Sequence, residues 1–245
     1  MKRQIKAAAA SAGVDVRLRK NAPFGISWEW DVHGLLGGQP DELTIFDIGA
    51  NVGQTAKSLA EVFPSSKIYS FEPVPETFAK LQNNTARIRN VECINMALGD
   101  TAGEAVVTSD RDGRNTLLSG IPSEGSASTK VETVDGFCAD RGIQRIDVLK
   151  TDTEGFETYV LKGASESLGK GVIDFIVAEC DFFRRQGEPH GDFFEIHDQL
   201  APLGFRVVSF YTGGVDSRGW VWGNVLLMRE GAADVRLMLS PYEPT

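Results

Sequence analysis

One stretch near the start of the chain, residues 43–55, constrains the fold more than any other. A short apolar, β-branched run leads through Asp47 into a loop that carries Gly49 and Gly53, and a helix-like pattern follows. A buried parallel strand that feeds a helix has this pattern. Glycine permits the tight turn and lets a ligand approach the helix start, where free backbone N–H groups converge. The stretch therefore predicts a ligand-binding turn, although a plain strand-to-helix turn would use the same glycines.

Beyond this stretch, strand-like apolar runs alternate with helix-like patterns as far as residue 228. Such alternation predicts an α/β fold, with a parallel sheet that has helices on both faces. The expected strands are 44–48, 67–71, 91–95, 104–108, 146–151, 173–178, 205–211 and 220–228. The expected helices between them are 54–62, 75–87, 134–141 and 191–203.

An acidic residue, Glu72, ends the second predicted strand, 25 residues after Asp47. An acid at this point is placed to hold the two hydroxyls of a ribose. The loop Gly-Ala-Asn-Val-Gly at 49–53 lacks the middle glycine of Gly-x-Gly-x-x-Gly, which brings a pyrophosphate close. The pattern therefore favours an adenosine ligand without a pyrophosphate over a dinucleotide.

Three motifs resemble those of the FkbM-type family of S-adenosylmethionine-dependent methyltransferases, and they occur in the same order. They are Asp-Ile-Gly-Ala-Asn-Val-Gly at 47–53, Phe-Glu-Pro at 71–73, and Lys-Thr-Asp-Thr-Glu-Gly-Phe-Glu at 150–157. The resemblance extends over about 44–228. It implies a class I methyltransferase fold: a Rossmann-like, doubly wound, seven-stranded sheet, mostly parallel with an antiparallel last strand. It also implies S-adenosyl-L-methionine as the cofactor and S-adenosyl-L-homocysteine as the product.

The resemblance further implies which residues hold the cofactor. Asp47 and the loop 49–53 would position the methionine part, Glu72 would hold the ribose, and the segment that contains Asn95 and Ala97 would lie along the adenine. A plain turn at the end of the third strand is the alternative for that segment. The full set of expected cofactor-binding residues is Asp47, Gly49, Ala50, Asn51, Gly53, Thr55, Glu72, Pro73, Asn95, Ala97 and Asp152.

Carboxylates follow several predicted strands, whose carboxyl ends share one edge of the sheet where ligands bind. A hydroxyl acceptor loses its proton on methylation, so a general base or a divalent cation assists the reaction. The expected catalytic residues are Asp152 and Glu154 beside the methyl donor, Glu179 at the fifth strand, and His190 in a following loop. Histidine is the usual proton acceptor near neutral pH, but a loop histidine is more often structural.

A metal site is an open alternative that the pattern does not favour. Asp152, Glu179 and Asp181 offer hard oxygen ligands suited to Mg²⁺. Their spacing is not diagnostic, and carboxylates bonded to backbone donors or to Arg184 and Arg185 explain them as well. We predict no metal site.

Three divisions of the chain are expected: a helix and packing arm at 1–42, a methyltransferase domain at 43–230, and a tail at 231–245. Within the arm, apolar residues alternate over 21–36, which predicts an extended segment. That segment could cap the substrate mouth, cover a sheet edge or join two copies in a homodimer. Within the domain, the polar insert 109–129 is expected to be an irregular substrate loop, with plain disorder as the alternative.

Composition limits the partners. The net charge of −9 argues against an electrostatic grip on nucleic acid, and the sequence has no apolar run long enough to span a membrane. Three widely spaced cysteines predict a reducing, cytoplasmic compartment. The expected partner is a small-molecule hydroxyl acceptor, a sugar or polyketide-like metabolite by resemblance. N-methylation, an NAD-binding reductase and a non-catalytic nucleoside-binding module remain as alternatives.

Overall fold

The computed structural model describes residues 24–38, 42–109, 115–118, 126–182, 191–217 and 219–233. The expected helix at the start of the arm, His190 and most of the predicted tail lie outside these ranges. Within the described ranges, no helix is long and apolar enough to cross a bilayer.

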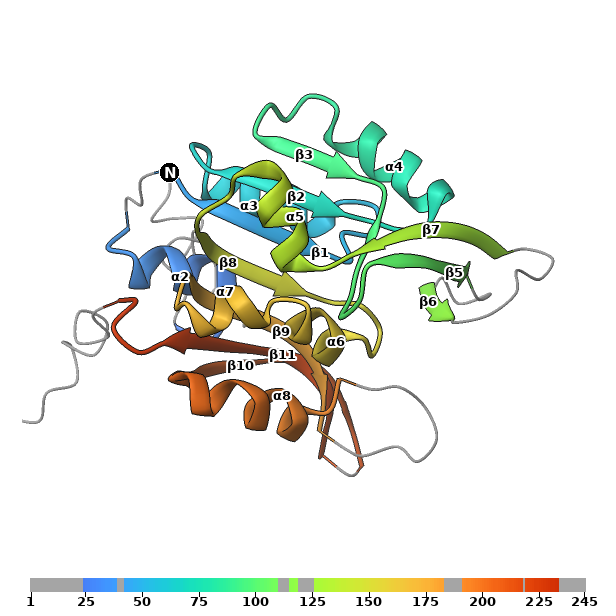
Figure 1. Cartoon of the computed structure of the whole chain (residues 1–245). Helices are drawn as coiled ribbons and strands as arrows, with labels where there is room; N and C mark the ends of the chain where they lie inside the picture. The colour runs from blue at the N-terminus through green and yellow to red at the C-terminus, as the bar shows by residue number, and fades with distance from the viewer. Residues whose placement is uncertain are drawn as a thin grey trace, which may run out of the picture.

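A seven-stranded sheet forms the centre of the described structure (Figure 1). Its strands are β1 (Thr44–Ile48), β2 (Lys67–Phe71), β3 (Val91–Ile94), β8 (Ile146–Thr151), β9 (Ile173–Asp181), β10 (Phe205–Asp216) and β11 (Gly219–Arg229). They are ordered β10-β11-β9-β8-β1-β2-β3. The strands from β9 to β3 are parallel, whereas β11 is antiparallel to both of its neighbours. This arrangement confirms the predicted doubly wound sheet with a reversed last strand.

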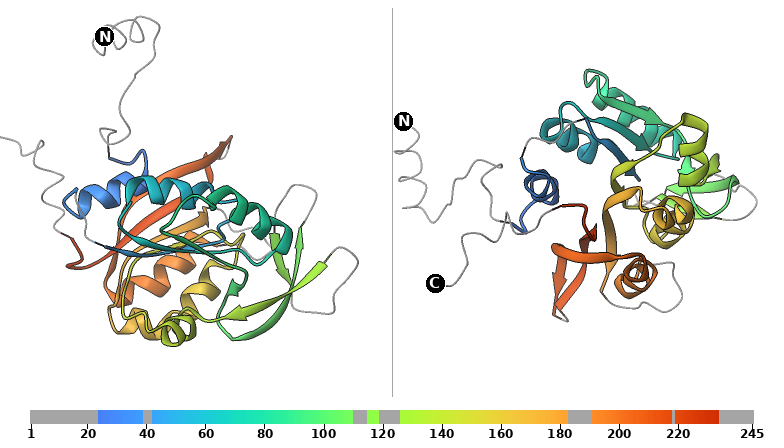
Figure 2. Two further views of the ribbon diagram at one scale, coloured as in Figure 1. Left: turned by 90° about the horizontal axis from the view of Figure 1, so that it is seen from above. Right: turned by 60° about the vertical axis from the view of Figure 1, so that its left-hand side comes forward.

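Three helices cover one face of the sheet: α2 (Trp28–Leu35), α3 (Gln54–Val62) and α4 (Pro75–Thr85) (Figure 2). The prediction of an extended segment over 21–36 was wrong where the structure describes it. Trp28, Val32 and Leu35 are spaced four and three residues apart, as on one side of a helix, and all three are buried. Phe24 and Ile26, which contributed to the period-2 alternation, precede the helix and are exposed. The buried stripe belongs to the same core cluster as Ile45 of β1 and Phe175 of β9.

The opposite face is covered by α5 (Val134–Arg141), α6 (Glu157–Lys162), α7 (Ser165–Gly169) and α8 (Phe193–Leu200), which continues into a 3₁₀ turn, η2 (Ala201–Leu203). Helix α5 begins at Thr133, whose hydroxyl oxygen accepts a hydrogen bond from the N–H of Gly136 at 2.9 Å. It inserts Phe137 against Phe46 and Phe71, with ring centroids 5.7 and 4.9 Å apart. This aromatic cluster fixes α5 against the strands that lead to the site.

A second, four-stranded sheet projects from the carboxyl end of the first (Figure 1). It consists of β4 (Ala97–Leu98), β5 (Gly103–Ser109), β6 (Asn115–Leu118) and β7 (Ser126–Glu132), in the order β4-β7-β5-β6. The insert 109–129, predicted to be irregular, therefore contains β6 and much of β7. The pairing of β4 with β7 consists of two residue pairs, Ala97 with Val131 and Leu98 with Glu132.

Candidate functional site

The turn after β1 is held between the ends of β2 and β8. The N–H groups of Gly49 and Ala50 donate to the carbonyl oxygen of Phe71 at 3.0 and 2.9 Å. Gly49 has a φ of 78°, and a Cβ there would lie 1.8 Å from the carbonyl oxygen of Asp152. Only glycine fits, because both the backbone conformation and the space exclude a side chain. The turn after β1 and the segment after β8 are thus in direct backbone contact.

The loop continues into α3 through two more residues in the left-handed region. Asn51 has a φ of 48°, and Gly53, which precedes the helix, has a φ of 92°. A Cβ at Gly53 would lie 2.9 Å from Cδ1 of Leu81 on α4. The tight turn predicted from the two glycines is therefore present, and the absence of a side chain at Gly53 leaves room for Leu81 of α4.

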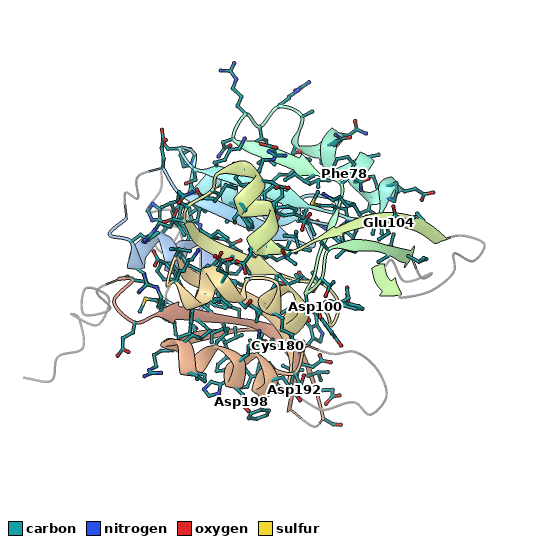
Figure 3. All side chains as sticks on the ribbon, viewed as in Figure 1. Phe78, Asp100, Glu104, Cys180, Asp192 and Asp198 are labelled. Atoms are coloured by element: carbon teal, nitrogen blue, oxygen red, sulfur yellow. The ribbon has the colours of Figure 1, made fainter. Side chains whose placement is uncertain are left out.

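A cavity of about 690 Å³ opens at the carboxyl ends of β1, β2 and β8. This volume is within the range of ligand pockets, roughly 300–1,000 Å³. The second sheet and α6 form its outer wall, and Asp100 and Glu104 lie at the base of that sheet (Figure 3). Predicted site residues on the cavity lining are Gly49, Asn51, Glu72, Pro73, Ala97, Asp152 and Glu154.

Glu72 lines the cavity although only 2% of its surface is exposed. Its Oε2 accepts a hydrogen bond from the N–H of Asn51 at 3.0 Å, and its Oε1 accepts one from the N–H of Val74 at 2.9 Å. Burial raises the pKa of this carboxyl, and the two backbone donors oppose the rise. The carboxylate is fixed in orientation from two sides, as a group that holds a pair of hydroxyls must be.

Behind the cavity lies a buried ionic group centred on Lys150, which sequence reasoning included in a motif but assigned no role. Its Nζ is 3.1 Å from Oδ2 of Asp152, 3.5 Å from Oδ1 of Asp47 and 3.5 Å from the carbonyl oxygen of Gly49. Burial lowers the pKa of Lys150, but the charges of Asp152 and Asp47 outweigh burial and raise it. The ammonium joins β1, β8 and the glycine turn. A charge inside the apolar run 146–151 was the signal that could have revealed it.

Asp47, predicted to contact the cofactor, is fully buried and is absent from the cavity lining. Its Oδ2 accepts a hydrogen bond from the hydroxyl of Ser70 at 3.4 Å, whereas its Oδ1 has no hydrogen-bond partner among the described residues. The structure therefore places Asp47 away from the cavity lining, with its Oδ1 3.5 Å from Nζ of Lys150.

Glu179 and Asp152 lie side by side at the ends of β9 and β8. The residues that precede them, Ala178 and Thr151, are paired in the sheet. Burial raises the pKa of Glu179 to about 9, and the charge of Asp152 adds to the rise. Two carboxyl groups this close share a proton more readily than both ionise. Glu179 is absent from the cavity lining but borders Asp152, which is on it.

The remaining predicted residues are more dispersed. The Asn95 amide donates to the carbonyl oxygens of Glu72 and Pro73 at 2.9 and 3.1 Å, so it holds the end of β2 in place. Residues absent from the cavity lining in the described structure are Asp47, Ala50, Gly53, Thr55, Asn95 and Glu179. The contacts predicted for these residues with a cofactor or acceptor stay predictions.

Sequence reasoning missed the outer wall. It is formed by the start of β5, by Val131 of β7, and by Phe156 and Tyr159, whose ring centroids are 5.7 Å apart. Aromatic residues at the start of a helix carry no distinctive pattern, and the insert was predicted to be irregular. Pairing of strands distant in the sequence created this wall.

The site has groups that suit S-adenosyl-L-methionine. The glycine turn leaves room for close approach, the fixed Glu72 carboxylate suits a ribose, and the Asp152 carboxylate suits a positively charged group. No group of three or more His, Cys, Asp or Glu side chains within the described ranges is arranged to hold a metal ion.

Comparison with known proteins supports the same assignment. Residues 47–207 match the family model of the methyltransferase FkbM domain. The 2-O-methyltransferase NoeI of Sinorhizobium fredii is 26% identical over 54% of this chain and 61% of its own length. The hexuronic acid methyltransferase AglP of Haloferax volcanii is 28% identical over 62% of each chain. The chain thus spans about three fifths of the length of these curated relatives.

A solved structure is similar in fold alone. Fibrillarin of Aeropyrum pernix, in complex with S-adenosyl-L-methionine, is 14% identical, with a TM-score of 0.45 over 77% of this chain and 67% of that chain. The family match, taken with the observed strand order, confirms the class I methyltransferase fold predicted from the three motifs.

Proposed function

Because the chain belongs to the FkbM family of methyltransferases, we propose that it transfers a methyl group from S-adenosyl-L-methionine to a hydroxyl of a small molecule. The observation that carries the proposal is the single cavity in which Gly49, Glu72 and Asp152, one from each family motif, come together. The favoured acceptor is a sugar unit, with a polyketide-like metabolite as the second class. The names of two relatives, a 2-O-methyltransferase and a hexuronic acid methyltransferase, support this choice.

In this proposal the cofactor lies along the inner cavity wall. Glu72, fixed by the N–H groups of Asn51 and Val74, binds the ribose hydroxyls. Ala97 and its neighbours line the adenine end, and Gly49 leaves space for the methionine part. Bound S-adenosyl-L-methionine supplies an electrophilic methyl group on a positively charged sulfur.

An acceptor hydroxyl must give up its proton as its oxygen becomes methylated. We propose that Asp152 acts as the base that accepts this proton. Its side chain is 34% exposed and lies on the cavity lining. Glu179 has a pKa of about 9, so near neutral pH it holds a proton and serves as a hydrogen-bond donor. His190 lies outside the described residues and keeps its predicted role as a candidate base.

The first experiment is calorimetric titration of S-adenosyl-L-methionine, S-adenosyl-L-homocysteine and NAD into the wild type and Glu72→Ala. We expect both adenosyl compounds to bind the wild type and to bind the variant at least tenfold more weakly. Asp147→Ala is the matched control, because Asp147 also accepts a backbone hydrogen bond, from Thr44 at 2.8 Å, but at the amino end of the sheet. Binding of NAD alone would overturn the proposal.

The acceptor class needs a second experiment, transfer of a labelled methyl group to a panel of compounds. Monosaccharides with free hydroxyls, hexuronic acids, polyketide alcohols and secondary amines make up the panel. Methylation of a sugar or polyketide hydroxyl supports the proposal, whereas methylation of the amines alone would assign the chain to N-methylation. Asp152→Asn should abolish methyl transfer to a hydroxyl, while its binding of S-adenosyl-L-methionine should remain measurable.

A further inference from the structure

The segment that carries Asp152 and Glu154 has an unfavourable backbone conformation, which contacts with the surrounding structure must stabilise. Glu154 has a φ of 55°, a left-handed conformation that is unfavourable for a non-glycine residue, and Gly155 has a φ of 105°. Such conformations persist where the surroundings over-determine them. Since both carboxylates line the cavity, whatever fixes this turn also fixes the reactive end of the site.

The side chain of Glu157 makes three of the hydrogen bonds that hold the turn. Its Oε1 accepts hydrogen bonds from the N–H of Thr153 at 2.7 Å, the hydroxyl of Thr153 at 3.0 Å and the N–H of Gly155 at 3.3 Å. Glu157 is 1% exposed. Burial raises the pKa of this carboxyl, and the hydrogen bonds from Thr153 and Gly155 oppose the rise.

The other oxygen of the same carboxylate faces a second segment. Oε2 has no hydrogen-bond partner among the described residues, and a Cβ at Gly191 would lie 2.4 Å from it. The carbonyl oxygen of Gly191 accepts the N–H of Asp181 at 2.8 Å, at the end of the strand that carries Glu179. Glu157 therefore lies between the turn after β8 and the segment beside the end of β9.

We propose that Glu157 is a positioning residue, whose buried carboxylate sets the placement of Asp152 and Glu154 in the cavity and the spacing of their turn from the end of β9. The inference rests on the proposed function only in taking S-adenosyl-L-methionine as the ligand. Glu157 does not line the cavity in the described structure, so its effect on binding passes through the turn.

The test is the dissociation constant of S-adenosyl-L-methionine, measured by calorimetry well below the melting temperature of each variant. Glu157→Ala should weaken binding at least tenfold, because the turn loses all three hydrogen bonds. Glu157→Gln should stay within threefold of the wild type, since its amide oxygen accepts the same bonds. Glu157→Asp keeps the carboxyl group on a side chain one methylene shorter, so its affinity for S-adenosyl-L-methionine should lie between those of the other two variants. This variant carries the test if Glu157→Ala does not fold.

Asp135→Ala is the matched control. Asp135 also accepts three hydrogen bonds, from the N–H groups of Glu166 and Ser167 and from the Ser167 hydroxyl, but it holds the start of α7, away from the cavity lining. This variant should melt at a lower temperature and bind S-adenosyl-L-methionine as the wild type does. Wild-type affinity in folded Glu157→Ala and Glu157→Asp, or equal loss in Asp135→Ala, overturns the inference. A wild type that binds no adenosyl compound instead overturns the proposed function.

Discussion

The hydroxyl of Tyr211 on β10 donates a 2.5 Å hydrogen bond to Oδ2 of Asp31 on α2. The N–H of Gly25 donates to the same oxygen at 2.8 Å, and only 4% of Asp31 is exposed. The two residues are 180 positions apart in the chain, so this bond fastens the N-terminal arm to the strand at the sheet edge. It locates the arm on the same face as α3.

Removing the Tyr211 hydroxyl should loosen this attachment. Tyr211→Phe leaves a buried carboxylate with one partner fewer, and we expect the free energy of unfolding to fall by about 1–3 kcal/mol. Urea denaturation measures the change. Tyr69→Phe is the control, because the Tyr69 ring packs against Phe137 and its hydroxyl has no hydrogen bond among the described residues. Equal losses in the two variants would contradict a specific role for the Asp31 bond.

The carboxyl of Glu179 should make stability depend on pH. Its pKa rises from 4.5 to about 9 in the folded protein, through burial and then the charge of Asp152. Between these values the folded state holds a proton that the unfolded state releases, so the free energy of unfolding falls as pH rises. Denaturation midpoints from pH 5 to 9 should therefore decline less steeply in Glu179→Gln. Exposed Glu195→Gln should keep the wild-type slope, and an unchanged slope in Glu179→Gln would contradict the assignment.

Gly49 and Gly142 allow a comparison between strain alone and strain with a clash. Both have positive φ, 78° and 66°, but a Cβ at Gly142 would meet nothing within 4 Å. Gly142→Ala should lower the free energy of unfolding by about 1–2 kcal/mol, because alanine is disfavoured in a left-handed backbone conformation. Gly49→Ala must also displace the carbonyl oxygen of Asp152, so it should abolish binding of S-adenosyl-L-methionine. Calorimetry and thermal melting separate the two effects, and intact binding in Gly49→Ala would refute the close contact.

Trp222 offers an aromatic surface on the face of the sheet that carries Glu179. It lies two residues before Asn224 on β11, and Asn224 pairs with Glu179, so the three side chains share one face of the sheet. Trp222 is 41% exposed, and Gly213 and Gly214 leave space for its ring. We expect Trp222→Ala to raise the KM for a sugar acceptor several-fold and to leave the affinity for S-adenosyl-L-methionine unchanged.

The control for Trp222 is Phe194→Ala. Phe194 is 55% exposed, but it lies on α8, which packs on the opposite face. Steady-state kinetics with a methylated sugar from the panel would check both variants. The assignment fails if the two variants change the acceptor KM to the same extent, or if Trp222→Ala weakens cofactor binding instead.

Much of the central sheet could be predicted because its strands are buried on both faces and read as continuous apolar runs. Strand β8 and helix α5 have the predicted bounds, 146–151 and 134–141. Glu72 could be placed because its position depends only on a strand end and a short turn. The arm was harder, since Trp28 and Trp30 fit a period of two as well as a helix over so few residues.

The ionic group and the outer wall could not be predicted, for a different reason. The side chain of Asp47 contacts Lys150 because the two residues are paired on adjacent strands, β1 and β8. Neither the pairing nor the face of the sheet can be read from the sequence of β1 alone. The role of Glu157 depends on a turn whose shape it helps to impose. The wall depends on β5 and β7 meeting across the insert. Each is a long-range relationship that local pattern does not encode.

The short pairing of β4 with β7 suggests where the acceptor specificity of such an enzyme can be altered. Within the second sheet, β4 pairs with β7 through Ala97 and Leu98, and β5 and β6 attach on the other side of β7. We expect an exchange of residues 103–131 between relatives to reshape the outer cavity wall, which Glu104, Val107 and Val131 line. Gly49, Glu72 and Asp152 would keep their places, so new acceptors can be sought by recombination without rebuilding the cofactor site.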